Sequence, residues 1–140
     1  MRDLPEMKIL PVTDETTRRD FVRVASTVFY VPPAVARQIY GSERYWRSQM
    51  VGWVGYLNGR PVSTAATHNG AGAVGVYCVA TLASHRGRGC AERITRYAVE
   101  RAMPGSGYRR LILQSTPAGL QLYERMGYRT GTRFAVYVSQ

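Results

Sequence analysis

The feature that most constrains this chain is a glycine-rich turn at residues 85–91, with the sequence HRGRGCA. Residues 75–82, before the turn, form a short apolar run rich in valine and tyrosine, a pattern typical of an interior strand. After the turn, apolar side chains recur at helical spacing from Ala91 to Ala102, with charged side chains on the opposite face. The chain is therefore predicted to run from a buried strand, through this turn, into an amphipathic helix.

A turn of this kind is suited to binding an anion. The first amides of a helix lack partners within the helix, and they lie at the positive end of the helix dipole. Arg86 and Arg88 add positive charge at the same place. We therefore expect residues 86–91 to bind a phosphate-bearing ligand.

Two common phosphate-binding motifs do not fit the turn. A nucleotide-triphosphate P-loop needs a lysine after its last glycine, and Lys8 is the only lysine of the chain. The dinucleotide fingerprint needs a third glycine where this chain has Glu92. Residues 70–75, GAGAVG, match that fingerprint by letter, but they lead into a strand. We interpret them as a hairpin loop.

The pattern Arg86-x-x-Gly89-x-Ala91, after a strand that ends in VAT, resembles the acetyl-CoA signature of the GNAT acetyltransferase superfamily. A second block, LQSTPAG followed by LYERMGY, is similar to the family's later strand and the end of its next helix. The resemblance covers roughly residues 50–139. It implies an α+β fold with a mixed, mainly antiparallel central sheet, flanked by helices and splayed at the strand that binds acetyl-CoA.

The resemblance also implies an activity: transfer of the acetyl group of acetyl-CoA to a primary amine, by direct attack in a ternary complex. The acceptor would be a small molecule or a peptide, and no metal is expected. Backbone amides of the turn would hold the pyrophosphate, and amides of the strand would bind the pantetheine arm and the carbonyl oxygen. The residues expected to bind the cofactor are Val79, Ala80, Thr81, Arg86, Gly87, Arg88, Gly89, Cys90, Ala91 and Ser115. Ser115 has a second interpretation, as a cap of the following helix.

Tyr123 matches the family's tyrosine that can protonate the sulfur of coenzyme A. The alternative is a packing aromatic on the last helix. No general base is assigned, because Glu92 and Glu100 flank Arg96 in an ordinary ion-pair arrangement. Water is the remaining acceptor for the proton.

Charge is unevenly distributed along the chain, whose net charge is +10. Residues 1–43 balance their acids and bases, so the surplus lies in residues 44–140. A basic surface attracts coenzyme A, but it also attracts nucleic acid. A nucleic-acid-binding module is therefore an alternative, although the arginines are scattered and no stacking motif is evident. A non-catalytic regulator that binds acetyl-CoA is the third reading.

Length and composition predict one domain over residues 1–140. The sequence has no apolar run of 18 residues, so we expect no membrane span. It has no secretory pattern at its start, and its two cysteines form no metal or disulfide framework. A reduced cytoplasmic setting is expected. The family resemblance makes a homodimer through the final strands the default.

Periodicity and turn signals predict the remaining elements. A helix capped by Thr13 should end before Pro32, and a strand over residues 7–12 is in doubt because of Pro11. Tyr45 and Trp46 are expected in a loop or in the lead-in to the next strand. The other elements are a helix at 34–40, a hairpin of 50–57 and 61–68, a helix at 89–103, a strand at 109–114, a helix at 117–126 and strands within 128–138.

Overall fold

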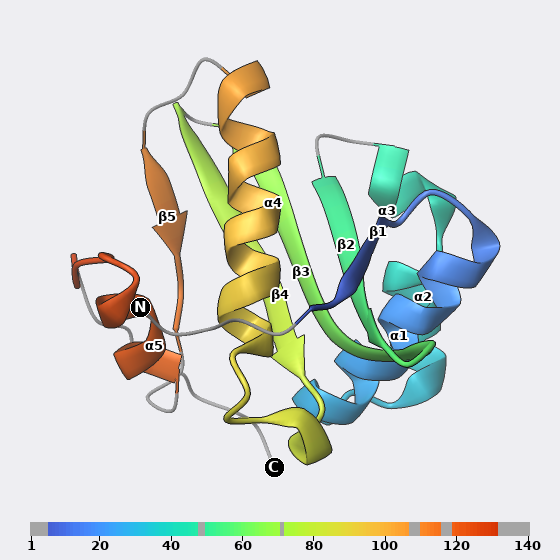
Figure 1. Cartoon of the computed structure of the whole chain (residues 1–140). Coiled ribbons are helices and arrows are strands. Elements are labelled where there is room, and N and C mark those ends of the chain that lie inside the picture. The colour runs from blue at the N-terminus through green and yellow to red at the C-terminus, as the bar shows by residue number, and fades with distance from the viewer. Residues whose placement is uncertain (1–5, 48–49, 71, 107–109, 116–118, 132–140) are drawn as a thin grey trace, which may run out of the picture.

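The computed structural model describes residues 6–47, 50–70, 72–106, 110–115 and 119–131. Within these residues the centre of the molecule is a five-stranded sheet whose strands lie in sequence order (Figure 1). The strands are β1 (Lys8–Pro11), β2 (Met50–Leu57), β3 (Arg60–Gly70), β4 (Ala73–Thr81) and β5 (Leu111–Leu113). Neighbours from β1 to β4 are antiparallel, and β5 lies parallel to β4. The expected α+β fold with a mixed, mainly antiparallel sheet is confirmed.

Helices cover both faces of this sheet (Figure 1). They are α1 (Glu15–Phe29), α2 (Pro33–Tyr40), α3 (Glu43–Arg47), α4 (Cys90–Ser106) and α5 (Leu120–Arg125), and a 3-10 turn, Ala83–His85, precedes α4. Helices α1 and α4 both pack against β2, β3 and β4. Adjacent residues of β3 show that they do so from opposite faces: Ala65 packs in a cluster with Ile94 of α4, and Ala66 in a cluster with Phe21 of α1.

The start of α1 differs by one residue from the prediction. Asp14, not Thr13, is the N-cap residue, because its Oδ1 accepts a hydrogen bond from the Thr17 amide at 2.8 Å. The Thr17 hydroxyl in turn accepts from the Asp14 amide at 3.2 Å, which completes a capping box. These bonds hold the pKa of the Asp14 carboxyl below its usual value of 3.8, mainly through the Thr17 amide.

Contacts between residues distant in the sequence determine the structure of two N-terminal segments, residues 8–11 and 43–47. Strand β1 is present, and Pro11 is its last residue, on an edge strand where a missing amide is tolerated. The expected loop at Tyr45 and Trp46 is wrong, since both residues lie in α3. There the Trp46 ring meets the edge of Phe21 at 4.9 Å, and its Nε1 donates to the Tyr40 carbonyl at 2.8 Å.

The hairpin expected at residues 70–75 is present, but its loop is shorter than predicted. Strand β3 continues to Gly70 and β4 begins at Ala73, and these two residues pair with each other. Only a tight turn remains between the strands, and Gly72 takes the left-handed conformation there with a φ of 77°. Pairing of the long hairpin therefore extends through a segment that reads as a loop by composition.

The C-terminal elements follow the predicted order with different bounds. Helix α4 continues to Ser106, and α5 begins at Leu120. Residues 128–131 form neither helix nor strand, and the strands expected at 132–138 lie outside the described residues.

Candidate active site

The central feature of the site is a β-bulge in β4. Thr64 pairs with Ala80 and Ala66 with Tyr77, so β4 uses one residue more than β3 over this stretch. Cys78, inside the bulge, has a φ of 54°, a left-handed conformation that is uncommon for a residue other than glycine. Strain of this kind costs on the order of 1 kcal/mol, so neighbouring contacts must hold it.

Two buried hydroxyl groups of β3 provide these contacts. Thr64 Oγ1 donates to the Cys78 carbonyl at 2.8 Å, and Ser63 Oγ donates to the Ala80 carbonyl at 2.8 Å. Both residues are fully buried. A carbonyl displaced from the strand ladder would be unsatisfied without such a donor. Sequence analysis missed both residues, because serine and threonine in a strand give no signal of this role.

Strand β4 separates from β5 beside this bulge. Described pairing joins residues 74–76 of β4 to residues 111–113 of β5 and extends no further. Residues 77–81 therefore have no paired strand on that side among the described residues. The expected splay is present, and it leaves this edge of β4 open.

A cavity of about 650 Å³ occupies the opening, and we call it the central cavity. It is lined by Val28, Phe29, residues 76–81, 85–87, 89–92 and 113–115, Gly119, Leu122, Tyr123 and Arg125. Val28 and Phe29 belong to α1, whereas residues 90–92 open α4. Since α1 and α4 cover opposite faces, the central cavity reaches both faces of the sheet through the gap between β4 and β5.

The glycine turn forms the α4 side of the central cavity. Gly87 and Gly89 have φ values of 77° and 86°, in the left-handed region that favours glycine. The Gly89 carbonyl accepts from the Arg93 amide at 3.0 Å, so it begins the ladder of α4 and the next amides are those of the first turn. Arg86 Nε donates to the Thr81 carbonyl at 3.2 Å, which ties the turn to the end of β4.

All but one of the residues expected to bind the cofactor line this cavity. The exception is Arg88, which lies on the same turn with an exposed side chain. Cys90 differs in another respect, because its side chain is buried in the core with Ile94 and Val62. Burial raises the pKa of the Cys90 thiol, so Cys90 is a core residue and offers the cavity its backbone.

Tyr123 and Ser115 line the central cavity from the β5 side. The Tyr123 side chain is largely buried, and its ring meets Tyr128 edge-on at 5.9 Å. Burial raises the pKa of the Tyr123 phenol, so it is protonated at neutral pH. The N-cap position of α5 is Gly119, so Ser115 is not the residue that caps this helix.

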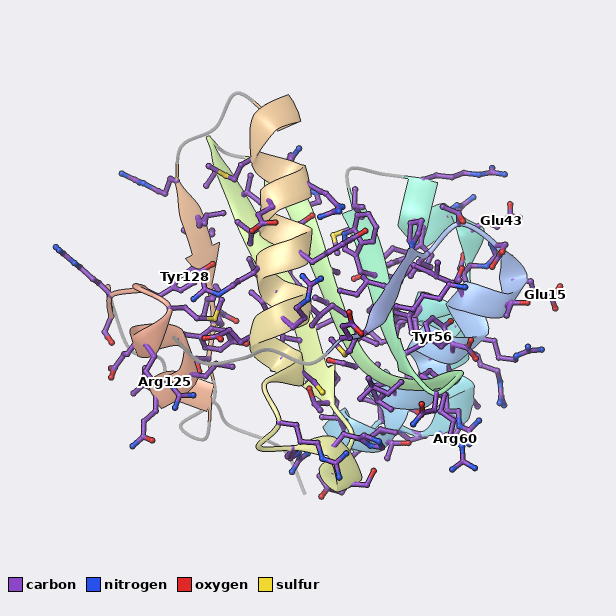
Figure 2. The ribbon with its side chains drawn as sticks, in the orientation of Figure 1. Glu15, Glu43, Tyr56, Arg60, Arg125 and Tyr128 are labelled. Carbon is purple, nitrogen blue, oxygen red and sulfur yellow. The ribbon has the colours of Figure 1, made fainter. Side chains whose placement is uncertain are left out.

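Charged groups near the central cavity are few. The Glu92 carboxylate lies 3.6 Å from the Arg96 guanidinium, with 13% of its side chain exposed. His85 Nδ1 lies 2.7 Å from the Ser84 hydroxyl. Arg86 and Arg125 add positive charge, and Figure 2 shows Arg125 at the opposite side of the molecule from Glu43. The lining is therefore more basic than acidic.

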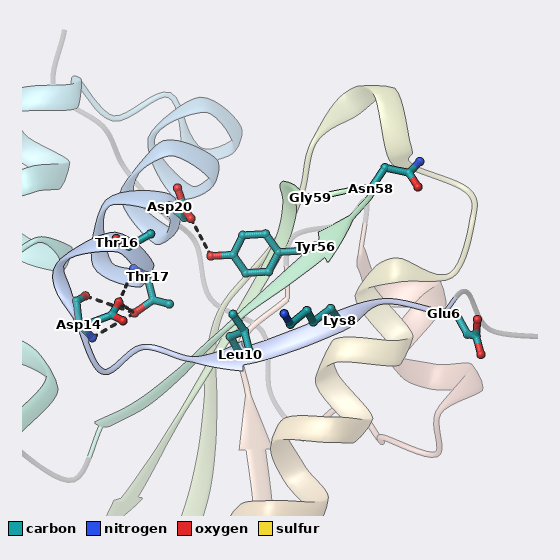
Figure 3. A pocket seen from close by; sticks show the side chains of 10 residues that line it. All are labelled: Glu6, Lys8, Leu10, Asp14, Thr16, Thr17, Asp20, Tyr56, Asn58 and Gly59. Carbon is teal, nitrogen blue, oxygen red and sulfur yellow. Dashed lines mark hydrogen bonds between the residues drawn. The ribbon is translucent and has the colours of Figure 1, made fainter.

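A second cavity, of about 550 Å³, lies at the β1 edge of the sheet (Figure 3). This edge cavity is lined by Glu6, Lys8, Leu10, Asp14, Thr16, Thr17, Asp20, Tyr56, Asn58 and Gly59. Its acids mostly have structural partners, because Asp14 caps α1 and Asp20 Oδ2 accepts from the Tyr56 hydroxyl at 2.7 Å. We therefore assign it no chemistry.

Two other kinds of site are not found in the part of the chain that the structure describes. No group of three or more His, Cys, Asp or Glu side chains is arranged to hold a metal ion there. No helix among these residues is both long enough and apolar enough to cross a membrane.

Solved structures of low sequence identity share this fold. The aminoglycoside N-acetyltransferase AAC(6')-Iy, in complex with a bisubstrate analogue of coenzyme A, has a TM-score of 0.79 at 17% identity, over 97% of this chain and 99% of that chain. Glucosamine-6-phosphate N-acetyltransferase from Arabidopsis thaliana has a TM-score of 0.72 at 14% identity, over 96% and 100%. An acetyltransferase from Clostridium acetobutylicum, solved with acetyl-CoA, has a TM-score of 0.74 at 14% identity, over 95% and 96%.

Sequence comparison gives the family. No curated protein sequence matches the chain significantly. The model of the acetyltransferase (GNAT) domain matches residues 48–130, which is more than half of the chain. That range contains the bulged strand, the glycine turn and Tyr123, and this chain therefore belongs to the acetyltransferase (GNAT) domain family.

Proposed function

We propose that this protein transfers the acetyl group of acetyl-CoA to a primary amine, by direct attack within a ternary complex. One observation carries the proposal. A single cavity joins a helix-opening glycine turn, the open edge of a bulged strand and a buried tyrosine. These parts match the needs of the reaction: an anion site for the diphosphate, donors for the carbonyl oxygen and a donor for the leaving sulfur.

Acetyl-CoA would bind across the α4 side of the central cavity. The amides that open α4 would hold its diphosphate, with Arg86 and Arg125 adding charge. The open edge of β4 near Val79 and Thr81 would take the pantetheine arm, since its backbone has no strand partner there among the described residues. Two of the similar structures were solved with acetyl-CoA or a coenzyme A bisubstrate analogue, which supports acetyl-CoA as the donor.

The chemical step needs the amine in its neutral form. Its nitrogen attacks the thioester carbonyl carbon, negative charge develops on the oxygen, and the carbon–sulfur bond then breaks. We assign stabilisation of this oxygen to the amide of Val79, the residue that follows Cys78 in the chain. The proton lost by the amine passes to water in the central cavity, because Glu92 is paired with Arg96.

Tyr123 acts on the leaving sulfur. A phenol has an ordinary pKa of about 10 and a thiol one of about 8.5, so complete proton transfer is uphill by about 2 kcal/mol. Burial of Tyr123 raises the phenol pKa and widens this gap. Tyr123 therefore stabilises the thiolate by donating a hydrogen bond, and solvent supplies the proton afterwards.

Two measurements test the proposal. Calorimetry with acetyl-CoA should give saturable binding that weakens in Arg86→Ala, and release of free thiol should then depend on added amine. Saturable binding without thiol release, across a broad panel of amines, would instead identify a regulator. Absence of any coenzyme A binding would overturn both readings.

We also infer that the chain forms a single catalytic domain. Because Cys78 and Cys90 are both unpaired thiols, we infer that this domain works in the reducing cytoplasm. A homodimer is inferred from the family resemblance alone. Sedimentation of the full chain, with and without coenzyme A, tests that inference.

A further inference from the structure

The α1 side of the central cavity is built from aromatic and aliphatic side chains. Val28 and Phe29 line it from the end of α1, and Tyr77 lines it from β4, one residue before the bulge. Phe29 and Tyr77 keep 41% and 44% of their surface exposed, which is high for large rings in a folded domain. We call these three residues the aromatic wall. It lies beside the open strand where the acetyl group would be held.

Tyr77 is fixed in place by the residue beneath it. A Cβ atom at Gly75 would come within 2.6 Å of the Tyr77 ring, so the ring lies directly over this glycine. The ring can hold this position only because position 75 has no side chain. Gly75 therefore has a packing role, and the ring that it accommodates faces the central cavity.

The groups behind the wall carry no charge near neutral pH. Cys78 Sγ lies 3.7 Å from the Tyr40 hydroxyl, in a cluster that packs against α1. Burial raises the pKa of Tyr45 to about 12 and that of Tyr40 still higher. Burial also raises the pKa of the Cys78 thiol. The residues that line this side of the cavity, Val28, Phe29, Tyr77 and Cys78, thus offer ring and aliphatic surface, a thiol and one hydroxyl.

The charged groups of the lining argue against a polycation. Arg86 and Arg125 are both positive, and the only carboxylate among the described lining residues, Glu92, is paired with Arg96. The diphosphate of the donor would neutralise the two arginines, so the argument rests on the acid: a substrate with several ammonium groups would find no unpaired carboxylate among the described lining residues to bind. A substrate with one amine and an apolar body would meet no such penalty.

We propose that the acceptor is a monoamine with a flat apolar body, which packs against Phe29 and Tyr77 with its amino group directed at the bulge of β4. This rests on the proposed acetyl transfer. Phe29 and Tyr77 are then the residues that determine acceptor specificity. The acceptor class differs from that in the name of the aminoglycoside enzyme whose fold is so similar.

The test compares three acceptors: 2-phenylethylamine, ethanolamine and spermine. We expect kcat/KM for 2-phenylethylamine to exceed that for each of the others at least tenfold. Tyr77→Ala should lower this preference about tenfold through the KM for the amine, whereas Tyr77→Phe, which keeps the ring, should keep the preference. Gly75→Ala should act like Tyr77→Ala. Val51→Ala, an equally exposed strand residue outside the central cavity, is the control.

The outcomes separate the two proposals. Acetylation of spermine or ethanolamine at equal or higher kcat/KM overturns the acceptor class and leaves the acetyltransferase proposal standing. Binding of acetyl-CoA without transfer to any amine overturns the catalytic proposal. In that case calorimetry of 2-phenylethylamine with the coenzyme A complex tests whether the aromatic wall binds the amine. Binding that Tyr77→Ala weakens supports this role of the wall, and no binding overturns it.

Discussion

The central cavity and the edge cavity are close in size, about 650 and 550 Å³, but their polar groups are used differently. In the edge cavity, Asp14 caps α1 and Asp20 binds the Tyr56 hydroxyl. In the central cavity, a strand is opened, a turn is built on two left-handed glycines, and Tyr123 lies buried. Volume therefore does not identify the site. The central cavity is distinguished by the backbone of residues 77–81, which has no paired strand on the β5 side among the described residues.

The two cavities also contain chemically matched residues. Each has a tyrosine and each has a glycine in the left-handed conformation. The same substitution can therefore be made in both places, and the comparison then separates function from stability.

The largest effect is expected at the tyrosines. Tyr123→Phe should lower turnover about 100-fold, because a donor to the leaving sulfur is lost in the transition state. Its KM for acetyl-CoA should change little. The matched variant, Tyr56→Phe, loses only the hydrogen bond to Asp20, so stability should fall by about 1 kcal/mol and turnover should be unchanged. Steady-state rates and urea unfolding measure both, and equal turnover in Tyr123→Phe and wild type would remove Tyr123 from the mechanism.

The glycines should give the next largest effect. Gly87 and Gly59 have φ values of 77° and 78°, and a Cβ atom at either would meet nothing within 4 Å. Valine at either position is strained by the backbone, at a cost on the order of 1–3 kcal/mol. We expect Gly87→Val to weaken acetyl-CoA binding about 30-fold in calorimetry, and Gly59→Val to destabilise the protein equally with no change in binding. Equal affinities for the two variants would show that the turn does not hold the diphosphate.

Two buried threonines, one bonded to the bulge and one on α4, allow a second comparison of matched variants. Thr64→Val leaves the Cys78 carbonyl without its donor, so we expect a loss of about 1–3 kcal/mol in stability and a severalfold lower turnover. Thr95, on α4, is equally buried, but its Oγ1 has no partner among the described residues. Thr95→Val should therefore be neutral or stabilising. Thermal unfolding and steady-state rates check both variants, and a stabilised Thr64→Val would contradict the role of the bulge.

The smallest effect concerns the acids of the edge cavity. The pKa of Asp14 is lowered in the folded state, so its ionised form contributes stability that is present at neutral pH. This contribution is lost as the pH falls from about 4 through the lower folded pKa. We expect Asp14→Ala to be less stable than wild type at pH 7, and the difference to shrink towards pH 2. A difference that stays constant over this range would mean that the carboxylate charge has no part in the cap.

The parts of the site that sequence analysis predicted are those encoded by short stretches of sequence. Gly87 and Gly89 mark a turn because their conformations need glycine, and Tyr123 was found by its place in a motif on one helix. The hairpin of residues 50–57 and 61–68 was predicted from a similar local signal, the Asn58-Gly59 pair between its strands. Each of these features is encoded by residues that are close together in the chain.

The features that sequence analysis missed depend on distant partners. The bulge puts a cysteine, not a glycine, in the left-handed conformation, and it is held by hydroxyls of Ser63 and Thr64, 14 or more residues away in the chain. The helix at Tyr45 and Trp46 is fixed by contacts with Phe21 and Tyr40. Pro11 was weighed as a strand breaker, but it lies on an edge. No pattern within one segment reports such neighbours.

The central cavity passes through the sheet, so the glycine turn, at the start of α4, and the aromatic wall, from α1 and β4, lie on opposite faces of the sheet. Substitutions at Phe29 or Tyr77 leave Gly87, Gly89 and the end of α4 untouched. A lineage built on this scaffold can therefore exchange one accepted molecule for another while its donor half stays constant. The solved acetyltransferase structures compared above share this fold at sequence identities as low as 14%.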